Sequence, residues 1–473
     1  MRKIDSEHWC DRKVMETTTP RSSSAESMSE LGPGGGRRGG ISLFTATCIV
    51  IANMIGTGIF TSLGFQVGDL PSGFTIVALW TIGGLCALCG ALAYGELAAT
   101  LPRSGGEYHF LSVIFHPVVG FVAGWLSITA GFAAPVALAA IAFGKYFNGF
   151  APGVDAMGLA IGVVAIVTVI HLCGIGVGSA FQNVATILKV TLVAALVVAG
   201  FSIGDSQGVS FLPSANEGAL IASTPFAVSL IYVMYAYSGW NASTYIVGEV
   251  RRPSHTVPIS IALGTLIVTV LYVGVNAAFL YSTPISEMAG KVEVAHVAAA
   301  HIFGPTGGRI MAALICGGLI STISAMTWVG PRVAMAMGED WAALRWLAKK
   351  NRTGIPMVAI VAQTVLVIVL ITIGSFEAVL TYVQFSLQLC SFLAVLGVIV
   401  LRFTRPDLPR PYRTWGYPFT PLIFLAVSAW MMGHILTTKT TESLSGLATL
   451  MIGAVVYWIS VRKRSADKIR DAQ

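Results

Sequence analysis

Two short segments place glycine and polar residues in the middle of long apolar runs. Residues 55–60 read Ile-Gly-Thr-Gly-Ile-Phe, and residues 235–241 read Tyr-Ala-Tyr-Ser-Gly-Trp-Asn. Each glycine lowers helix stability by roughly 1 kcal/mol relative to alanine, so both segments predict a helix that unwinds part-way along its length. Unwinding in an apolar medium requires other groups to satisfy the freed backbone N–H and C=O groups. Both segments are therefore candidate ligand sites.

The two sides of such a break offer opposite partial charges. N–H groups at the start of one half-helix attract a carboxylate, and C=O groups at the end of the other attract an ammonium group. One break can thus recognise both charges of an α-amino acid. Close packing between helices is the alternative explanation for either glycine motif alone. The interruption of both the first and the sixth run favours the binding site of a transporter built from two five-helix repeats.

A third candidate is an isolated cation, Lys189, in the segment Ala-Thr-Ile-Leu-Lys-Val-Thr-Leu at residues 185–192. No acidic residue lies near it in the sequence, and an ionisable side chain inside an apolar run is by default a functional candidate. The alternative is that the long side chain extends to a nearby membrane interface, since Lys189 lies only about nine residues into its run.

The elements that must position these residues are long apolar segments. Of the 473 residues, 55% are hydrophobic and 11% are charged, against roughly 25% charged in a soluble protein. The apolar residues form runs of about 20, the length that crosses a hydrocarbon core roughly 30 Å thick. The sequence therefore predicts an all-α integral membrane protein with twelve transmembrane helices, near residues 42–66, 73–100, 107–146, 157–175, 180–203, 223–247, 257–282, 306–337, 356–374, 376–402, 418–437 and 445–461.

The basic residues predict the orientation of these spans. With a cytoplasmic N-terminus, the cytoplasmic segments hold 24 of the 29 lysines and arginines, as the positive-inside rule requires. We therefore expect both termini to be cytoplasmic. The net charge of +7 reflects this topology and not nucleic-acid binding, because the basic residues are scattered over loops and form no reading motif.

The rest of the sequence indicates no second activity. Cys86 and Cys89 form a Cys-x-x-Cys pair within an apolar run without a nearby histidine, which favours packing over a redox or metal site. The eight histidines are dispersed, so we expect no enzyme, no metal and no cofactor. Residues 1–40 are rich in serine and glycine and lack a signal-peptide core, which predicts a disordered cytoplasmic tail, and residues 462–473 form a second tail.

An ordered series of motifs resembles the amino acid–polyamine–organocation (APC) superfamily, and within it the bacterial L-type amino acid transporter-like permeases. The resemblance covers about residues 42–461. It implies a leucine-transporter-type fold, in which a first repeat at 41–203 recurs inverted at 223–402, with two further helices at 418–461. The motifs are 56–58 (Gly-Thr-Gly), 94–97 (Tyr-Gly-Glu-Leu), 102–108 with Pro102, Gly105, Gly106, Glu107 and Tyr108, 236–241 with Glu249 and Pro253 behind it, 330–333 (Gly-Pro-Arg-Val) and 406–413 (Pro-Asp-Leu-Pro-Arg-Pro-Tyr-Arg).

The resemblance implies a role for each site residue. The substrate carboxylate is expected at the Thr57 hydroxyl and the N–H groups of Gly58 and Ile59. Tyr235 is expected to cover the site, with Trp240 as a second gating residue. Lys189 matches a lysine whose ammonium stands in for the sodium ion of sodium-coupled relatives. The remaining substrate-site residues are Met54 or Ile55, with Tyr235, Ala236 and Ser238, whose carbonyls meet the ammonium; Gly56 and Gly239 in the breaks; and Ala133 and Ala134, which line the pocket.

The expected function is sodium-independent transport of a small neutral L-amino acid by alternating access, as exchange or with a proton. A cationic amino acid or polyamine is the alternative substrate, although no acidic residue lies near either break in sequence. A non-transporting sensor or channel is the alternative from another class. We expect a multi-pass protein of the cell membrane (plasma or inner) in contact with lipid. No disulfide-linked heavy subunit is expected, because residues 148–155 contain no cysteine.

Overall fold

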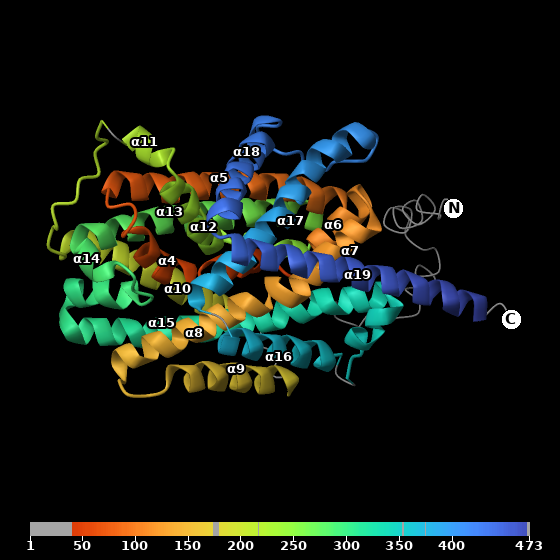
Figure 1. Ribbon diagram of the computed structural model, residues 1–473, viewed down its shortest axis with the longest axis horizontal. Coiled ribbons are helices and arrows are strands. Elements are labelled where there is room, and N and C mark those ends of the chain that lie inside the picture. The colour runs from red at the N-terminus through yellow and green to blue at the C-terminus, as the bar shows by residue number, and fades with distance from the viewer. Residues whose placement is uncertain (1–39, 174–178, 216, 352–353, 374, 471–473) are drawn as a thin grey trace, which may run out of the picture.

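The computed structural model describes residues 40–173, 179–215, 217–351, 354–373 and 375–470, with the side chains of 179–182 and 463–470 left out. Most of the predicted N-terminal tail, and the end of the predicted C-terminal tail, therefore lie outside the described residues. Within the described ranges the chain forms helices and no strand. Figure 1 shows most of the long helices, including α5, α13 and α15, running roughly along the longest axis of the molecule.

The helices follow one another in this order: α3 (Leu43–Met54), α4 (Gly58–Gln66), α5 (Gly73–Thr100), α6 (Glu107–Ile114), α7 (Pro117–Leu126), the π-helical turn η1 (Ser127–Gly131), α8 (Ala133–Phe150), α9 (Ala156–Leu172), α10 (Ser179–Ser202), α11 (Glu217–Ile221), α12 (Thr224–Tyr237), the 3₁₀ segment η2 (Ala242–Glu249), α13 (Pro253–Ser282), α14 (Ile285–Met288), α15 (Val294–Asp340), the 3₁₀ segment η3 (Ala342–Ala348), α16 (Met357–Ile373), α17 (Phe376–Thr404), α18 (Phe419–Thr438) and α19 (Thr440–Arg470).

Nine helical segments of the described chain are long and apolar enough to cross a membrane. Two shorter apolar helices, α9 and α16, correspond to the predicted spans near 157–175 and 356–374. The predicted sixth span is divided into α12 and η2, so neither piece alone has the length of a membrane helix. The protein is therefore a multi-pass membrane protein.

Two predicted spans differ from the structure at their N-terminal ends. The third span was predicted from residue 107, but α6 ends at Ile114 and a new helix begins at Pro117. His116 has an extended conformation there, because the residue before a proline avoids helical angles. The eighth span was predicted from residue 306, whereas α15 begins at Val294 and contains a kink at Gly304, whose φ is 76°.

Helices that are distant in sequence pack in pairs. α4 packs against α12, α5 against α13, α8 against α15, and α9 against α16. Small residues make the approach close: a Cβ atom at Gly84 of α5 would lie 2.4 Å from Thr269 Cγ2 of α13. The residues of the two broken helices belong to the larger of the two buried cores in the described structure.

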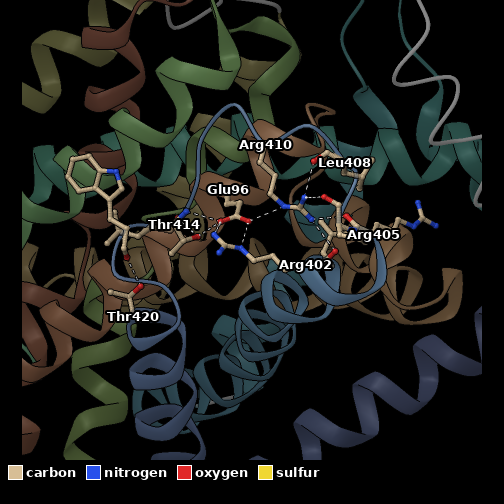
Figure 2. Close-up of polar contacts among 11 residues, drawn as sticks. Glu96, Arg402, Arg405, Leu408, Arg410, Thr414 and Thr420 are labelled. Atoms are coloured by element: carbon tan, nitrogen blue, oxygen red, sulfur yellow. Dashed lines mark hydrogen bonds and ion pairs between the residues drawn. The ribbon is translucent and has the colours of Figure 1, made fainter.

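A buried ion-pair cluster joins the end of α5 to α17 and to the connection between α17 and α18 (Figure 2). The Glu96 carboxylate accepts hydrogen bonds from Arg402 Nε at 2.9 Å and Arg402 Nη2 at 2.6 Å. It also accepts from the Thr414 backbone N–H at 2.7 Å and the Thr414 hydroxyl at 2.8 Å. Arg410 Nε lies 3.5 Å from Glu96 Oε1, and the Arg410 guanidinium group donates to four backbone carbonyls within residues 401–408.

Candidate substrate site between two broken helices

Both glycine motifs interrupt their helices, and the two interruptions lie against each other. α3 ends at Met54 and α4 begins at Gly58, while α12 ends at Tyr237 and η2 begins at Ala242. A Cβ atom at Gly58 would lie only 2.4 Å from Ala236 Cα, so the two segments are in contact there. Gly239 has a φ of +95°, a conformation that glycine adopts without steric cost. The Thr57 hydroxyl and the Tyr235 hydroxyl also connect the breaks, 3.1 Å apart.

The first break exposes backbone donors. Gly58 and Ile59 are buried, and no acceptor among the described residues reaches their N–H groups. Helix N-termini leave such groups unpaired, but buried N–H groups without a partner are rare in folded proteins. The start of α4 is therefore a site where a carboxylate has donors available to it.

The carbonyl groups around the breaks divide into two sets. Met54 O already accepts from Gly56 N at 2.8 Å and from the Tyr272 hydroxyl at 2.6 Å. Tyr235 O accepts from Ser238 N at 2.9 Å. In contrast, no donor within the described chain reaches the carbonyl oxygens of Ala236 and Ser238. Among the carbonyls predicted to meet the ammonium group, those still available are therefore on the second break.

Lys189 extends from α10 to the first break. Its Nζ donates to Ile55 O at 3.1 Å and to Thr322 Oγ1 of α15 at 2.8 Å. The Lys189 side chain is buried, while its neighbour Leu188 on α10 is 64% exposed. The ammonium group therefore lies at the centre of the molecule and not near an end of α10.

A cavity of about 60 Å³ lies beside the second break. On one side it reaches Ser238 and Gly239, and Trp240 contributes to its wall. Ala133 and Ala134, the predicted lining residues, are fully buried in α8 and do not line this cavity. Their neighbours Phe132 and Pro135 line it instead. The other lining residues are Asn53, Glu107, Ser127, Gly131, Met234, Asn241, Ala242, Tyr245, Met326, Val329, Gln384, Leu387, Gln388, Ser391 and Phe424.

Trp240, a predicted gating residue, packs in an aromatic cluster. Its ring centroid lies 4.6 Å from that of Tyr94 in an edge-to-face arrangement and 6.5 Å from that of Phe424. Trp240 is 5% exposed. The ring thus anchors the second break to α5 and α18.

An acidic residue that the sequence analysis did not connect with the breaks lies beside the second one. Glu107, 4% exposed, accepts from Asn241 Nδ2 at 2.7 Å, from the Tyr94 hydroxyl at 2.8 Å and from the Tyr245 hydroxyl. The expectation that no acidic residue lies near either break is therefore wrong for the folded protein. Sequence distance could not reveal this contact, because 134 residues separate Glu107 from Asn241. The only sequence signal was the position of Glu107 in a family motif.

Broken helices that contact each other at the centre of a multi-pass helical protein define a membrane transporter. A family model for amino acid permeases matches residues 41–460, and the chain belongs to this family. This result confirms the resemblance to the APC superfamily. The protein is therefore a transporter of amino acids rather than an enzyme.

Individual relatives share about a quarter of their residues with the chain over nearly its whole length. The b(0,+)-type amino acid transporter 1 of Mus musculus is 26% identical over 89% of this chain and 88% of the relative. The serine/threonine exchanger SteT of Bacillus subtilis is 26% identical over 90% of this chain and 98% of the relative. The human cystine/glutamate transporter is 26% identical over 89% of this chain and 85% of the relative.

Proposed function

We propose that the protein transports neutral L-amino acids by alternating access, without sodium, as an exchanger or together with protons. The observation that carries the proposal is the arrangement of unpaired backbone groups at the two breaks. The N–H groups of Gly58 and Ile59 are available to a carboxylate, and the carbonyls of Ala236 and Ser238 to an ammonium group. The contact between Gly58 and Ala236 brings these donors and acceptors together.

The preference for a neutral substrate is supported by the state of Glu107. A cationic side chain or a polyamine requires an acidic partner in the site, and Glu107 is an acidic residue that lines the cavity. Its carboxylate is already held by Asn241, Tyr94 and Tyr245. These three donors use most of the roughly four acceptor positions of the carboxylate, which favours a neutral substrate over a cationic one.

Sodium independence is supported by Lys189. The carbonyl oxygen of Ile55 and the hydroxyl of Thr322 are oxygen groups suited to a cation, and the Lys189 ammonium donates to both. Thr57, Gly56 and Tyr235 complete the proposed site, in which Tyr235 closes over the substrate and Trp240 holds the second break in place.

The proposed architecture is twelve spans arranged as two inverted five-helix repeats, 41–203 and 223–402, followed by a helix pair at 418–461. The packing of α4, α5, α8 and α9 against α12, α13, α15 and α16 supports it, because each pair joins spans that are five apart in order. We further propose a cell-membrane location with both termini cytoplasmic and no disulfide-linked heavy subunit.

Uptake by purified protein in liposomes tests the function. Labelled serine, threonine, alanine, leucine, arginine and putrescine are supplied with and without internal substrate, a pH gradient and sodium. We expect neutral amino acids to be taken up, and stimulation by internal substrate or by a pH gradient distinguishes exchange from proton coupling. Uptake of arginine or putrescine in preference to every neutral amino acid would overturn the substrate class.

A further inference from the structure

Two glutamines occupy one face of α17, in the middle of an apolar span. Gln384 is 2% exposed and Gln388 is 3% exposed. They are four residues apart, so they lie on the same side of the helix, and both line the central cavity together with Ser391. Burying uncharged amides in a membrane span is costly unless they make hydrogen bonds. Their position therefore calls for a partner.

The hydrogen bonds of these amides form a chain that runs from α18 to the cavity. Gln388 Nε2 donates to the Ser428 hydroxyl at 2.7 Å, and Gln384 Nε2 donates to Gln388 Oε1 at 3.1 Å. The chain stops at Gln384 Oε1, a buried atom to which no group in the described part of the protein donates. Rotating both amides would leave an N–H₂ group there instead. In either arrangement Gln384 presents a polar atom that lacks a partner.

Gln384 shares this cavity with the second break, because Gln384, Ser238 and Gly239 all line it. A water molecule requires about 10–15 Å³ of this kind of volume, so a cavity of about 60 Å³ holds a short side chain. An amino acid whose ammonium group lies at the second break would extend its side chain into this space.

We infer that Gln384 is a specificity residue that selects short, uncharged side chains carrying a hydroxyl or carboxamide group over aliphatic side chains of the same size. A hydroxyl or a carboxamide both donates and accepts, so it pairs with Gln384 in either amide orientation. An aliphatic side chain leaves the buried amide unpaired. Gln388 and Ser428 act as positioning residues that hold Gln384 towards the cavity. This inference rests on the proposed function, since it assigns the substrate class of that site.

Threonine and valine provide the test, because they have nearly the same shape and differ in one hydroxyl group. Uptake of labelled L-threonine and L-valine is measured in liposomes with the wild-type protein, with Gln384→Leu and with Gln363→Leu. Gln363 of α16 is the matched control: it is also a buried glutamine with an unpartnered Oε1 in the described structure, but it does not line the cavity. For the wild-type protein and Gln363→Leu we expect threonine to be preferred at least about tenfold in kcat/KM. For Gln384→Leu we expect a ratio near one.

The outcomes separate this inference from the proposed function. Uptake of both amino acids by the wild-type protein at equal rates would overturn the specificity role and leave neutral amino acid transport intact. A preference for threonine that survives in Gln384→Leu would also overturn it. Failure of the wild-type protein to transport any neutral amino acid would instead refute the proposed function. If Gln384→Leu does not fold, Ser428→Ala replaces it as the test, since Ser428 lies outside the cavity lining. This variant should lower the preference for threonine over valine. An unchanged threonine-to-valine ratio would overturn the role of the hydrogen-bond chain in specificity.

Discussion

Gly56 and Gly58 flank Thr57 in the first break, but their surroundings differ. A Cβ atom at Gly58 would lie 2.4 Å from Ala236 Cα and 2.6 Å from Ala236 Cβ, closer than real side chains approach. A Cβ atom at Gly56 would meet Thr322 Cγ2 at 3.4 Å, an ordinary contact. Close packing and the proposed substrate recognition therefore coincide at Gly58, because the same absence of a side chain brings the two breaks together.

These two glycines give a matched pair of variants. Gly58→Ala must push the second break away, at a cost of about 1–3 kcal/mol for overpacking. We expect amino acid uptake to fall about tenfold or more, whereas Gly56→Ala keeps it within about twofold. Initial uptake rates in liposomes, normalised to the amount of folded protein, measure the difference. Similar rates for the two variants would show that the contact between the breaks does not control transport.

Lys189 is the residue whose removal tests the cation position. Lys189→Ala removes two hydrogen bonds from a charged donor, and such bonds contribute about 1.5–3 kcal/mol each. The Ile55 carbonyl and the Thr322 hydroxyl lose that partner. We expect uptake to fall about 100-fold or more. Lys145→Ala, at an exposed position of α8, is the control and should transport normally. Normal uptake by Lys189→Ala would favour a purely structural role for the side chain.

At the scale of the helices, Glu96 fixes the end of α5 to α17 and to the segment that leads into α18 (Figure 2). Glu96 is 2% exposed and is an acceptor for both Arg402 and Thr414. Removing one partner of a buried ion pair costs about 3–5 kcal/mol. We therefore expect Glu96→Gln to lower the melting temperature of the purified protein by several degrees.

The control for this prediction is an exposed ion pair on the same protein. Glu339 lies 3.4 Å from Lys350, and their side chains are 51% and 44% exposed. Exposed pairs contribute about 0–1 kcal/mol, so Glu339→Gln should leave the melting temperature unchanged. Equal melting temperatures for both variants would mean that the Glu96 cluster does not stabilise the junction between α5, α17 and α18.

The local sequence predicted most helix positions, because membrane helices are specified by composition over about 20 residues. It also predicted where two helices break, since glycine acts through the local backbone. It did not predict that α6 is a separate helix, although Pro117 was visible in the sequence. Nor did it predict the π-helical turn Ser127–Gly131, whose first and last residues line the cavity, because the local sequence Ser-Ile-Thr-Ala-Gly does not distinguish a π-helical turn from an α-helix.

At the scale of the whole molecule, the candidate site depends on contacts between distant segments. Glu107 meets Asn241, and Gln388 meets Ser428, through pairs that no periodicity connects. The family motifs pointed to residues near both breaks, but they did not show which backbone carbonyls are already occupied. Met54 is the clearest example, because its carbonyl accepts from Tyr272, 218 residues away.

Sodium dependence is a property of the whole transport cycle, and the contacts of Lys189 lead us to expect uptake that does not depend on sodium. In a sodium-coupled transporter an ion must enter and leave an oxygen-lined position during each cycle. Here the Ile55 carbonyl and the Thr322 hydroxyl already accept from the Lys189 ammonium, which is covalently attached and cannot leave. We therefore expect the initial rate of neutral amino acid uptake to be the same in sodium chloride and in choline chloride.

The measurement uses liposomes with matched ionic strength, membrane potential and pH on both sides, so that cation identity is the only variable. Potassium chloride serves as the control for a non-specific effect of choline. A steep rise of uptake with sodium concentration would contradict the assignment, because it would require a sodium site elsewhere and leave Lys189 without its proposed role.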